Sequence, residues 1–373
     1  MKKKIGWILG IILIVAVGYG WHTYKKFDAK MIRLTPEFIK ELNKQSAAQN
    51  EAAIKKPEFR ERTLQPQNPL KNVYFGDLHV HTSLSLDAYM CGNTNYTPDQ
   101  AYEFAQGKKL EHVSGEILQL SEPLDFVAIT DHAESFGIFD GCKAPGLTEK
   151  QKEFCAKLDS PSLAYYYKLR KNVLERPPKR PADYCGEDDS FCIEHGKTTW
   201  KRIQKAADKA YKPGEFTSFY GYEYSPLWPK AGMTHRNVIF RNKTVPETVI
   251  SAFDAMTALD LWKILEDTCT GDCEFLTIPH NMSNFFGRAY SRNDEDGAPY
   301  TPKDWERRDR YEPLAEIFQA KRTSECAFGV GTTDEECSFE LFWPICEDDN
   351  LVGCASKGSY AREGLKLGIE LEK

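Results

Sequence analysis

The sequence has no excess of positive charge. Its 373 residues include 49 lysines and arginines against 55 aspartates and glutamates, which leaves a net charge of −6 at pH 7. Proteins that bind nucleic acids need a basic surface to meet the phosphates, so we expect no nucleic-acid partner. No internal repeat is visible. With 41% hydrophobic and 28% charged residues the chain is an ordinary folded protein, neither disordered nor collagen-like. The length allows two domains, or one barrel with long insertions.

The amino terminus lacks a cleavage site although it is strongly apolar. Three lysines in Met1–Lys4 precede Ile5–Trp21, a run of 17 residues without charge, which is long enough for a short membrane-spanning helix. Neither a small-x-small cleavage site nor a lipobox cysteine follows. We therefore predict a signal anchor or transmembrane segment over residues 1–26, with the body on the periplasmic or extracellular side. A cleaved signal and a secreted protein are the alternative. The polar residues 27–70 are predicted to form a juxtamembrane spacer.

Cysteine is abundant: the chain has 11 cysteines, an odd number that leaves at least one without a partner in the same chain. Oxidising compartments permit disulfides, which suits an exported body. A zinc-thiolate site is the weaker interpretation, because Cys269 and Cys273 have no second matching pair nearby. Pairing neighbours along the chain leaves Cys91 over. The neighbouring pairs, each of which closes a short loop, are Cys142 with Cys155, Cys185 with Cys192, Cys269 with Cys273, Cys326 with Cys337, and Cys346 with Cys354.

Short apolar runs that resemble buried strands alternate with helical stretches. Thr97–Ala105 begins with a helix-start signal, and Trp200, Ile203, Ala207 and Tyr211 follow an amphipathic helical spacing. This alternation predicts an α/β fold with a mainly parallel sheet or barrel. The segment 136–214 is too long for one connection and is predicted to be an insertion or lid. The strand-like runs are Val73–Val80, Leu124–Thr130, Phe216–Tyr222, Asn237–Phe240, Phe275–Ile278 and Leu314–Phe318.

Five of the eight histidines lie at the ends of these runs. His79 and His81 share one face of the first run because side chains alternate along a strand. Asp87 follows after a turn that can fold the chain back. The next runs end at His132, Glu223 and His280, whereas His235 stands at the start of its run. The carboxyl ends of barrel strands converge on one mouth, so we expect these side chains to meet there.

Each of these histidines alone would be read as a structural hydrogen-bonding group. Jointly, a His-x-His pair on a strand, three more strand-end histidines and nearby carboxylates match the ligands of zinc, manganese or iron. A carboxylate in such a set can bridge two ions. His22, His112 and His195 lie in other contexts and are interpreted as incidental.

Three sequence motifs resemble the first three motifs of the polymerase and histidinol phosphatase (PHP) superfamily: YFGDLHVHTSLSLD at 74–87, DFVAITDH at 125–132 and GYE at 221–223. Three more resemble a narrower branch, the domain of unknown function 3604: THRNVIF at 234–240, IPHN at 278–281 and EPLAEIFQ at 312–319. The motifs occur in order, and the resemblance covers the body from about residue 73 to residue 373.

The resemblance implies a distorted (β/α)7 TIM-like barrel over residues 71–373, with a disulfide-bearing insertion at about 136–214. It also implies two or three divalent ions and hydrolysis of phosphoesters. The family's final Asp-x-His motif is missing after His280, so we expect the chain to be a fragment or a truncated version. The residues that match metal-ligand positions are His79, His81, Asp87, His132, Glu223, His235 and His280, with Glu223 as the bridging carboxylate.

The resulting hypothesis is a metal-dependent hydrolase, most simply a phosphoesterase acting on a small anionic substrate. Asp131 is predicted to orient a ligand or to carry a proton, and Arg236 to bind the anionic group. Two alternatives stay open. The same ligands would polarise an amide, a lactone or a sulfate ester, and a metal-stabilised envelope protein would have no catalytic role at all.

Overall fold

The computed structural model describes residues 59–61, 68–69, 71–90, 92–112, 115–159, 163–228, 232–346 and 354–372. The predicted anchor over residues 1–26, nearly all of the spacer and Cys91 lie outside these residues. Within the described part, no helix combines the length and apolar character needed to cross a membrane. The described residues therefore give no support to the predicted membrane anchor or to the membrane location that depended on it.

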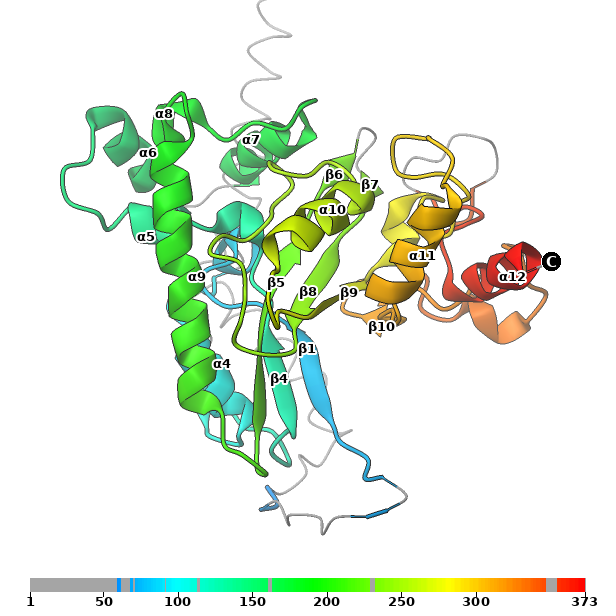
Figure 1. The fold of residues 1–373 in the computed structure, drawn as a ribbon. Helices are drawn as coiled ribbons and strands as arrows, with labels where there is room; N and C mark the ends of the chain where they lie inside the picture. Colours follow the sequence, from blue (N-terminus) through cyan, green and yellow to red (C-terminus); the bar gives the residue numbers. More distant parts are fainter. Residues whose placement is uncertain are drawn as a thin grey trace, which may run out of the picture.

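A curved five-stranded sheet forms the centre of the fold, in the order β1-β4-β5-β8-β9 (Figure 1). Neighbours β1, β4 and β5 are parallel, whereas β8 runs antiparallel to both β5 and β9. The strands are β1 (Gly76–Val80), β4 (Phe126–Ile129), β5 (Thr217–Tyr224), β8 (Arg236–Phe240) and β9 (Phe275–Pro279).

The predicted (β/α)7 TIM-like barrel is wrong. In the described residues the sheet has five strands, with β1 and β9 as its two edges, and it does not close. Residues 225–235 connect β5 to β8 and are too few for the crossover that a parallel pair requires. The chain therefore turns back through the small hairpin β6 (Leu227–Trp228) and β7 (Gly232–Met233), which makes β8 antiparallel.

The helix α9 (Ser190–Ala210) supplies the crossover between β4 and β5 and runs along the sheet (Figure 1). Trp200, Ile203 and Ala207 are buried at helical spacing. The Trp200 ring packs edge-on against Tyr222 and its Nε1 donates to the Pro246 carbonyl at 3.0 Å. The segment predicted as an insertion thus ends in a helix that covers the sheet.

Further short elements complete the described structure. The helices are α3 (Leu86–Met90), α4 (Pro98–Ala105), α5 (Ile138–Gly141), α6 (Glu149–Asp159), α7 (Leu163–Leu174), α8 (Ala182–Cys185), α10 (Ala258–Thr268), α11 (Pro302–Tyr311) and α12 (Ala361–Leu371). The 3-10 helices are η1 (Ala133–Ser135), η3 (Met282–Phe285) and η4 (Glu335–Ser338). Two more strand pairs are β2 (Leu110–Glu111) with β3 (Ile117–Leu118), and β10 (Phe318–Gln319) with β11 (Arg322–Thr323).

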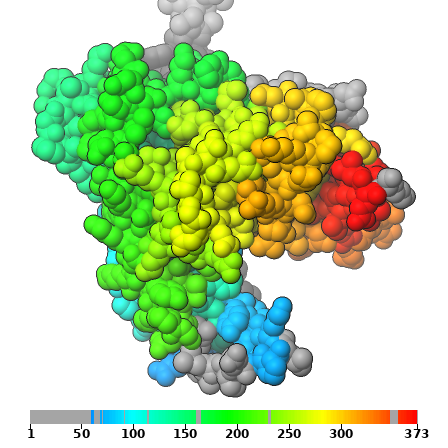
Figure 2. All heavy atoms as spheres, in the orientation of Figure 1, coloured from blue at the N-terminus to red at the C-terminus, as the bar shows by residue number. Residues whose placement is uncertain are grey.

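The carboxyl-terminal part of the chain, orange and red in Figure 2, forms a lobe that projects from the body. It has a small core of its own, in which Ala327, Val330, Ala355 and Tyr360 are buried together. All five neighbouring cysteine pairs are bonded as predicted: Cys142–Cys155, Cys185–Cys192, Cys269–Cys273, Cys326–Cys337 and Cys346–Cys354. Disulfides of this number are compatible with an extracellular location.

Candidate metal centre

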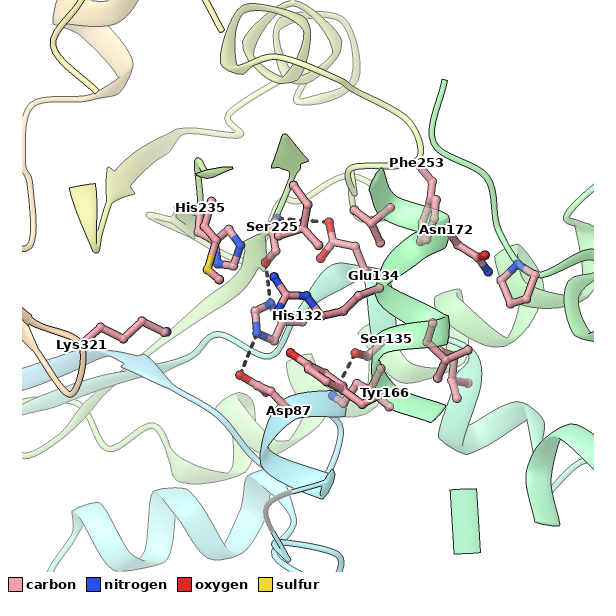
Figure 3. Close-up of a pocket in the computed structure, with 18 residues that line it drawn as sticks. Asp87, His132, Glu134, Ser135, Tyr166, Asn172, Ser225, His235, Phe253 and Lys321 are labelled. Carbon is pink, nitrogen blue, oxygen red and sulfur yellow. Dashed lines mark hydrogen bonds and ion pairs between the residues drawn. The ribbon is translucent and has the colours of Figure 1, made fainter. Parts of the chain in front are cut away.

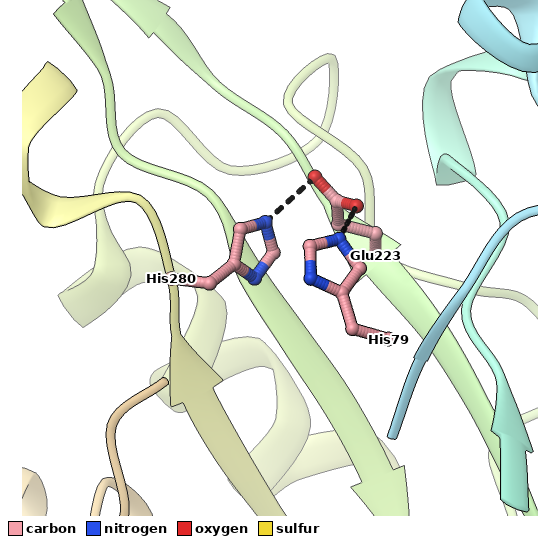
Figure 4. A group of neighbouring side chains, drawn as sticks. All are labelled: His79, Glu223 and His280. Atoms are coloured by element: carbon pink, nitrogen blue, oxygen red, sulfur yellow. Dashed lines mark ion pairs between the residues drawn. The ribbon is translucent and has the colours of Figure 1, made fainter. Parts of the chain in front are cut away.

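The Glu223 carboxylate, at the end of β5, is surrounded by imidazoles at one edge of the sheet. Its side chain is 1% exposed. The Oε1 atom lies 2.7 Å from His235 Nδ1 and 3.1 Å from His280 Nε2. The Oε2 atom lies 2.9 Å from His81 Nε2 and 3.3 Å from His79 Nε2. Figure 4 shows His79 and His280 pointing at the two oxygens of this carboxylate.

A fifth imidazole, His132, closes the arrangement into a ring. Its Nδ1 is 3.5 Å from Glu223 Oε1. Going round the ring, each imidazole lies next to the following one. The centroid separations are 5.2 Å from His79 to His81, 4.7 Å to His132, 5.6 Å to His235, 5.9 Å to His280 and 4.0 Å back to His79. We call these five histidines and Glu223 the Glu223 cluster.

Strand direction explains why the cluster assembles. His79, His132 and Glu223 stand at or just after the ends of the parallel strands β1, β4 and β5, and the backbones of His132 and Glu223 pair in an isolated parallel β-bridge. Because β8 is antiparallel, its start lies at the same edge as those carboxyl ends. His235 stands at the start of its run rather than at the end, and the reversed direction of β8 therefore brings it to the same edge as the other histidines. His280 joins it, since its N–H donates to the His235 carbonyl at 3.4 Å.

The contacts inside the cluster are close, but several are not hydrogen bonds. Glu223 Oε2 and both ring nitrogens of His235 and His280 are buried without a hydrogen-bond partner among the described residues. Burying such atoms unpaired is costly. Lone pairs that converge on a common point, rather than on one another, are what a metal site requires. Two groups have the necessary spacing, and they share Glu223: His79 with His280, and His81 with His132.

The protonation of the cluster is uneven. Burial lowers the pKa of His235 to about 4 and that of His280 to about 3, so both are neutral. Burial acts in the same direction on His79 and His132, but carboxylates outweigh it there. Glu223 and Glu316 raise the pKa of His79 to about 9, and Glu223 and Asp87 raise that of His132 to about 10. Burial would raise the pKa of Glu223, yet His132 and His280 hold it well below its ordinary value.

Asp131 is fully buried and orients its neighbours from outside the cluster. It accepts hydrogen bonds from the Thr82 amide at 2.6 Å and from Ser85 Oγ at 2.8 Å. Because the Ser85 proton is committed to Asp131, Ser85 Oγ accepts from His81 Nδ1, 2.8 Å away. That fixes the His81 tautomer and leaves Nε2 free to face Glu223. This position of Asp131 suits its predicted role in orienting a ligand, and both that role and the proton-carrying role stay predictions.

Glu316 is a member of the site that the sequence analysis missed. Its Oε2 lies 2.9 Å from His79 Nδ1, and its N–H donates to the Pro279 carbonyl at 3.0 Å. The carboxylate therefore holds the Nδ1 proton and directs Nε2 of His79 at Glu223. A detectable signal existed, because Glu316 is an acidic residue inside the apolar run 314–318.

Asp87, on α3, lies beside the cluster, with Oδ2 at 3.0 Å from His132 Nε2, and its predicted role as a metal ligand stays a prediction. Arg236 is placed differently. It pairs in register with Tyr224 rather than Glu223, which puts it on the other face of the sheet. There its buried guanidinium contacts Glu312 at 2.7 Å and Glu295 at 3.3 Å. Its predicted role in anion binding stays untested.

A cavity of about 320 Å³ opens beside the ring at His132 and His235 (Figure 3). Asp87 and Ser225 stand at the same end, and Ser225 Oγ lies within hydrogen-bond distance of His132 Nδ1 at 2.5 Å. The far wall comes from α7 in the segment predicted as an insertion. The Glu223 cluster thus borders this cavity through His132 and His235.

Comparison with known proteins gives one family and no individual relative. The family model described as "Protein of unknown function (DUF3604)" matches residues 68–373. No curated protein and no solved structure matches the chain.

Proposed function

The chain belongs to the DUF3604 family. From the geometry of its site we propose that it is a metal-dependent hydrolase. The observation that carries the proposal is the Glu223 cluster, in which five imidazoles face one buried carboxylate and an open cavity adjoins them. The order of its motifs, which resembles the PHP superfamily, supports the same conclusion.

The donor set suits first-row divalent ions. His79 and His280 would hold one ion with Glu223, and His81 and His132 would hold a second with the same carboxylate. Zinc, manganese or iron bound there would supply Lewis acidity, which lowers the pKa of water toward neutrality and polarises an ester oxygen.

The surrounding residues keep the site in order. Glu316 and Ser85 hold the Nδ1 protons of His79 and His81, so that both Nε2 lone pairs point inward. Asp131 fixes Ser85 in turn. This arrangement needs no protein nucleophile, and the role we propose for the chain is to position ions and substrate.

The cavity favours an enzyme over a metal site that only stabilises the fold. Structural metal sites are closed, whereas catalytic sites keep an open position for water or substrate. Here His132 and His235 belong both to the cluster and to the cavity wall. A phosphoester is our first choice of substrate because the cavity also carries two cations, Arg170 and Lys321.

The proposal is tested by hydrolysis. Purified protein, loaded with zinc or manganese, is offered an aryl phosphate, a phosphodiester and an aryl sulfate. We expect release of phosphate, and a loss of about 100-fold or more in His79→Ala, as for removal of a group that polarises the reacting ester. His195→Ala, on α9 and outside the cluster, is the matched control. Hydrolysis by His79→Ala equal to the parent's would remove the proposal, and preference for the sulfate would change the substrate class.

A further inference from the structure

We infer that the substrate is the phosphate monoester of an apolar alcohol, with its organic group in the cavity beside His132 and its anionic group between Lys321 and Arg170. The inference rests on the proposed hydrolase function for the reaction itself. It adds the substrate class, which the metal cluster alone does not define because ions of this kind polarise many oxygen centres.

The cavity wall is mainly apolar. It combines side chains from three separate parts of the fold, namely α7, the β6–β7 hairpin and the loop before α10. These side chains are Leu169 and Val173, Leu227 and Met233, and Phe253. A pocket of this size, with a mainly apolar surface and several polar side chains, is the usual form of a small-molecule site.

Two cations in the cavity are unpaired. Neither Lys321 nor Arg170 has a hydrogen bond or ion pair with any described residue, and Arg170 only packs over the Tyr166 ring at 5.6 Å. Other arginines nearby are engaged. Arg180, for example, contacts Asp254 at 3.0 Å. Figure 3 shows Lys321 reaching from the β10–β11 turn toward His132 and Asp87.

The carboxylates of the cavity do not pair with its two cations. Asp87 contacts His132. Glu134 Oε1 accepts from the backbone amides of Ser225 at 3.1 Å and Ala252 at 2.7 Å, and its Oε2 has no hydrogen-bond partner among the described residues. Lys321 and Arg170 are therefore available for an external anion. A phosphate monoester brings two negative charges and an ester oxygen to the cluster, which suits two separated cations.

The length of the ligand's alkyl group provides the test. Binding of n-alkylphosphonates with two, four and six carbons, whose C–P bond resists hydrolysis, is measured by calorimetry on the zinc-loaded protein. Release of phosphate from the matching alkyl phosphates is measured in parallel. We expect the Kd to fall by about fourfold for each added methylene until the cavity is full, the transfer free energy of one buried methylene. Equal affinities for all three lengths would overturn the inference, even if phosphate is released.

Variants separate the two ends of the cavity. Lys321→Met and Arg170→Met should each weaken phosphonate binding by about tenfold or more, as for loss of a charged contact. Lys168→Met, also on α7 but outside this cavity, should leave it unchanged. Val173→Phe should abolish the gain from longer chains, and Met233→Phe makes the same test if that variant does not fold. Unchanged binding in both cation variants would overturn the assignment of the anionic end.

The two proposals fail in different ways. Graded phosphonate binding without any phosphate release would support the cavity assignment and contradict the hydrolase. Phosphate release with no dependence on chain length, or on Lys321 and Arg170, would support the hydrolase and overturn the substrate class.

Discussion

Binding of divalent ions to the Glu223 cluster should release protons. Before an ion arrives, His79 and His132 are protonated at neutral pH, because carboxylates outweigh burial and raise their pKa to about 9 and about 10. Imidazole binds a metal only in its neutral form. Each of the two groups contains one of these residues, so each ion must displace one proton. With a pKa of about 9, competition with this proton weakens binding at the His79 group at pH 7 by about 50-fold relative to pH 9.

The direction of the pH dependence differs between the two forms of the protein. For ion binding, the apparent affinity should rise by about tenfold per pH unit at each group between pH 6.5 and 8. For the metal-free protein, folded pKa values above the unfolded value of about 6.5 stabilise the fold at low pH. That contribution is fully present below pH 6.5 and is lost as the pH rises through about 9 for His79 and about 10 for His132.

Calorimetry in two buffers of different ionisation enthalpy measures the proton count. At pH 7 we expect about two protons released when both groups fill, since each ion displaces one. His195→Ala should give the same number. Glu223→Gln should give fewer protons and weaker binding, because the charge that raises both imidazole pKa values is gone. No proton release in the parent, together with a flat affinity between pH 6.5 and 8, would refute the reasoning.

Other positions allow separate tests. Glu316→Gln should weaken ion binding about 10- to 100-fold in titrations, because His79 loses the carboxylate that orients it; unchanged affinity would contradict this. Arg236→Met should lower the free energy of unfolding by about 3–5 kcal/mol in denaturant melts, because Glu295 is left buried without its cation and Glu312 keeps only Arg308. Its ion content should stay normal, and a loss of ions would refute its placement away from the cluster. Trp200→Ala should cost about 3–5 kcal/mol by the same measurement, since the cavity it leaves lies between α9 and the sheet. A change below 1 kcal/mol would show that α9 is not the packed crossover described above.

Local signals in the sequence were sufficient for the strands of the main sheet and for two of the helices. Five of the six predicted runs are the strands of the main sheet, and Thr97 begins α4 with a capping box. The run Leu314–Phe318 is mostly irregular, and only its last residue enters β10. The disulfides also followed from spacing, since neighbouring cysteines need only a short closed loop.

Strand direction was not available from local patterns. The prediction of a mainly parallel sheet assumed that each connection could hold a crossover, whereas residues 225–235 cannot. The same reversal places His235 in the cluster. The wrong prediction of a mainly parallel sheet and the exceptional position of His235 at the start of its run therefore have one cause. Glu316 was missed because its neighbour His79 is distant in sequence, and Arg236 was placed in the site although strand alternation directs it away.

The central claim is that the Glu223 cluster holds divalent ions, and anomalous diffraction from zinc-loaded crystals tests it most directly. We expect anomalous peaks at two positions, one near His79 and His280 and one near His81 and His132, both adjacent to Glu223. Each should lie about 2.0–2.2 Å from its imidazole nitrogens and from the carboxylate. Peaks confined to other surfaces, with the cluster free of zinc in a folded protein, would contradict the claim.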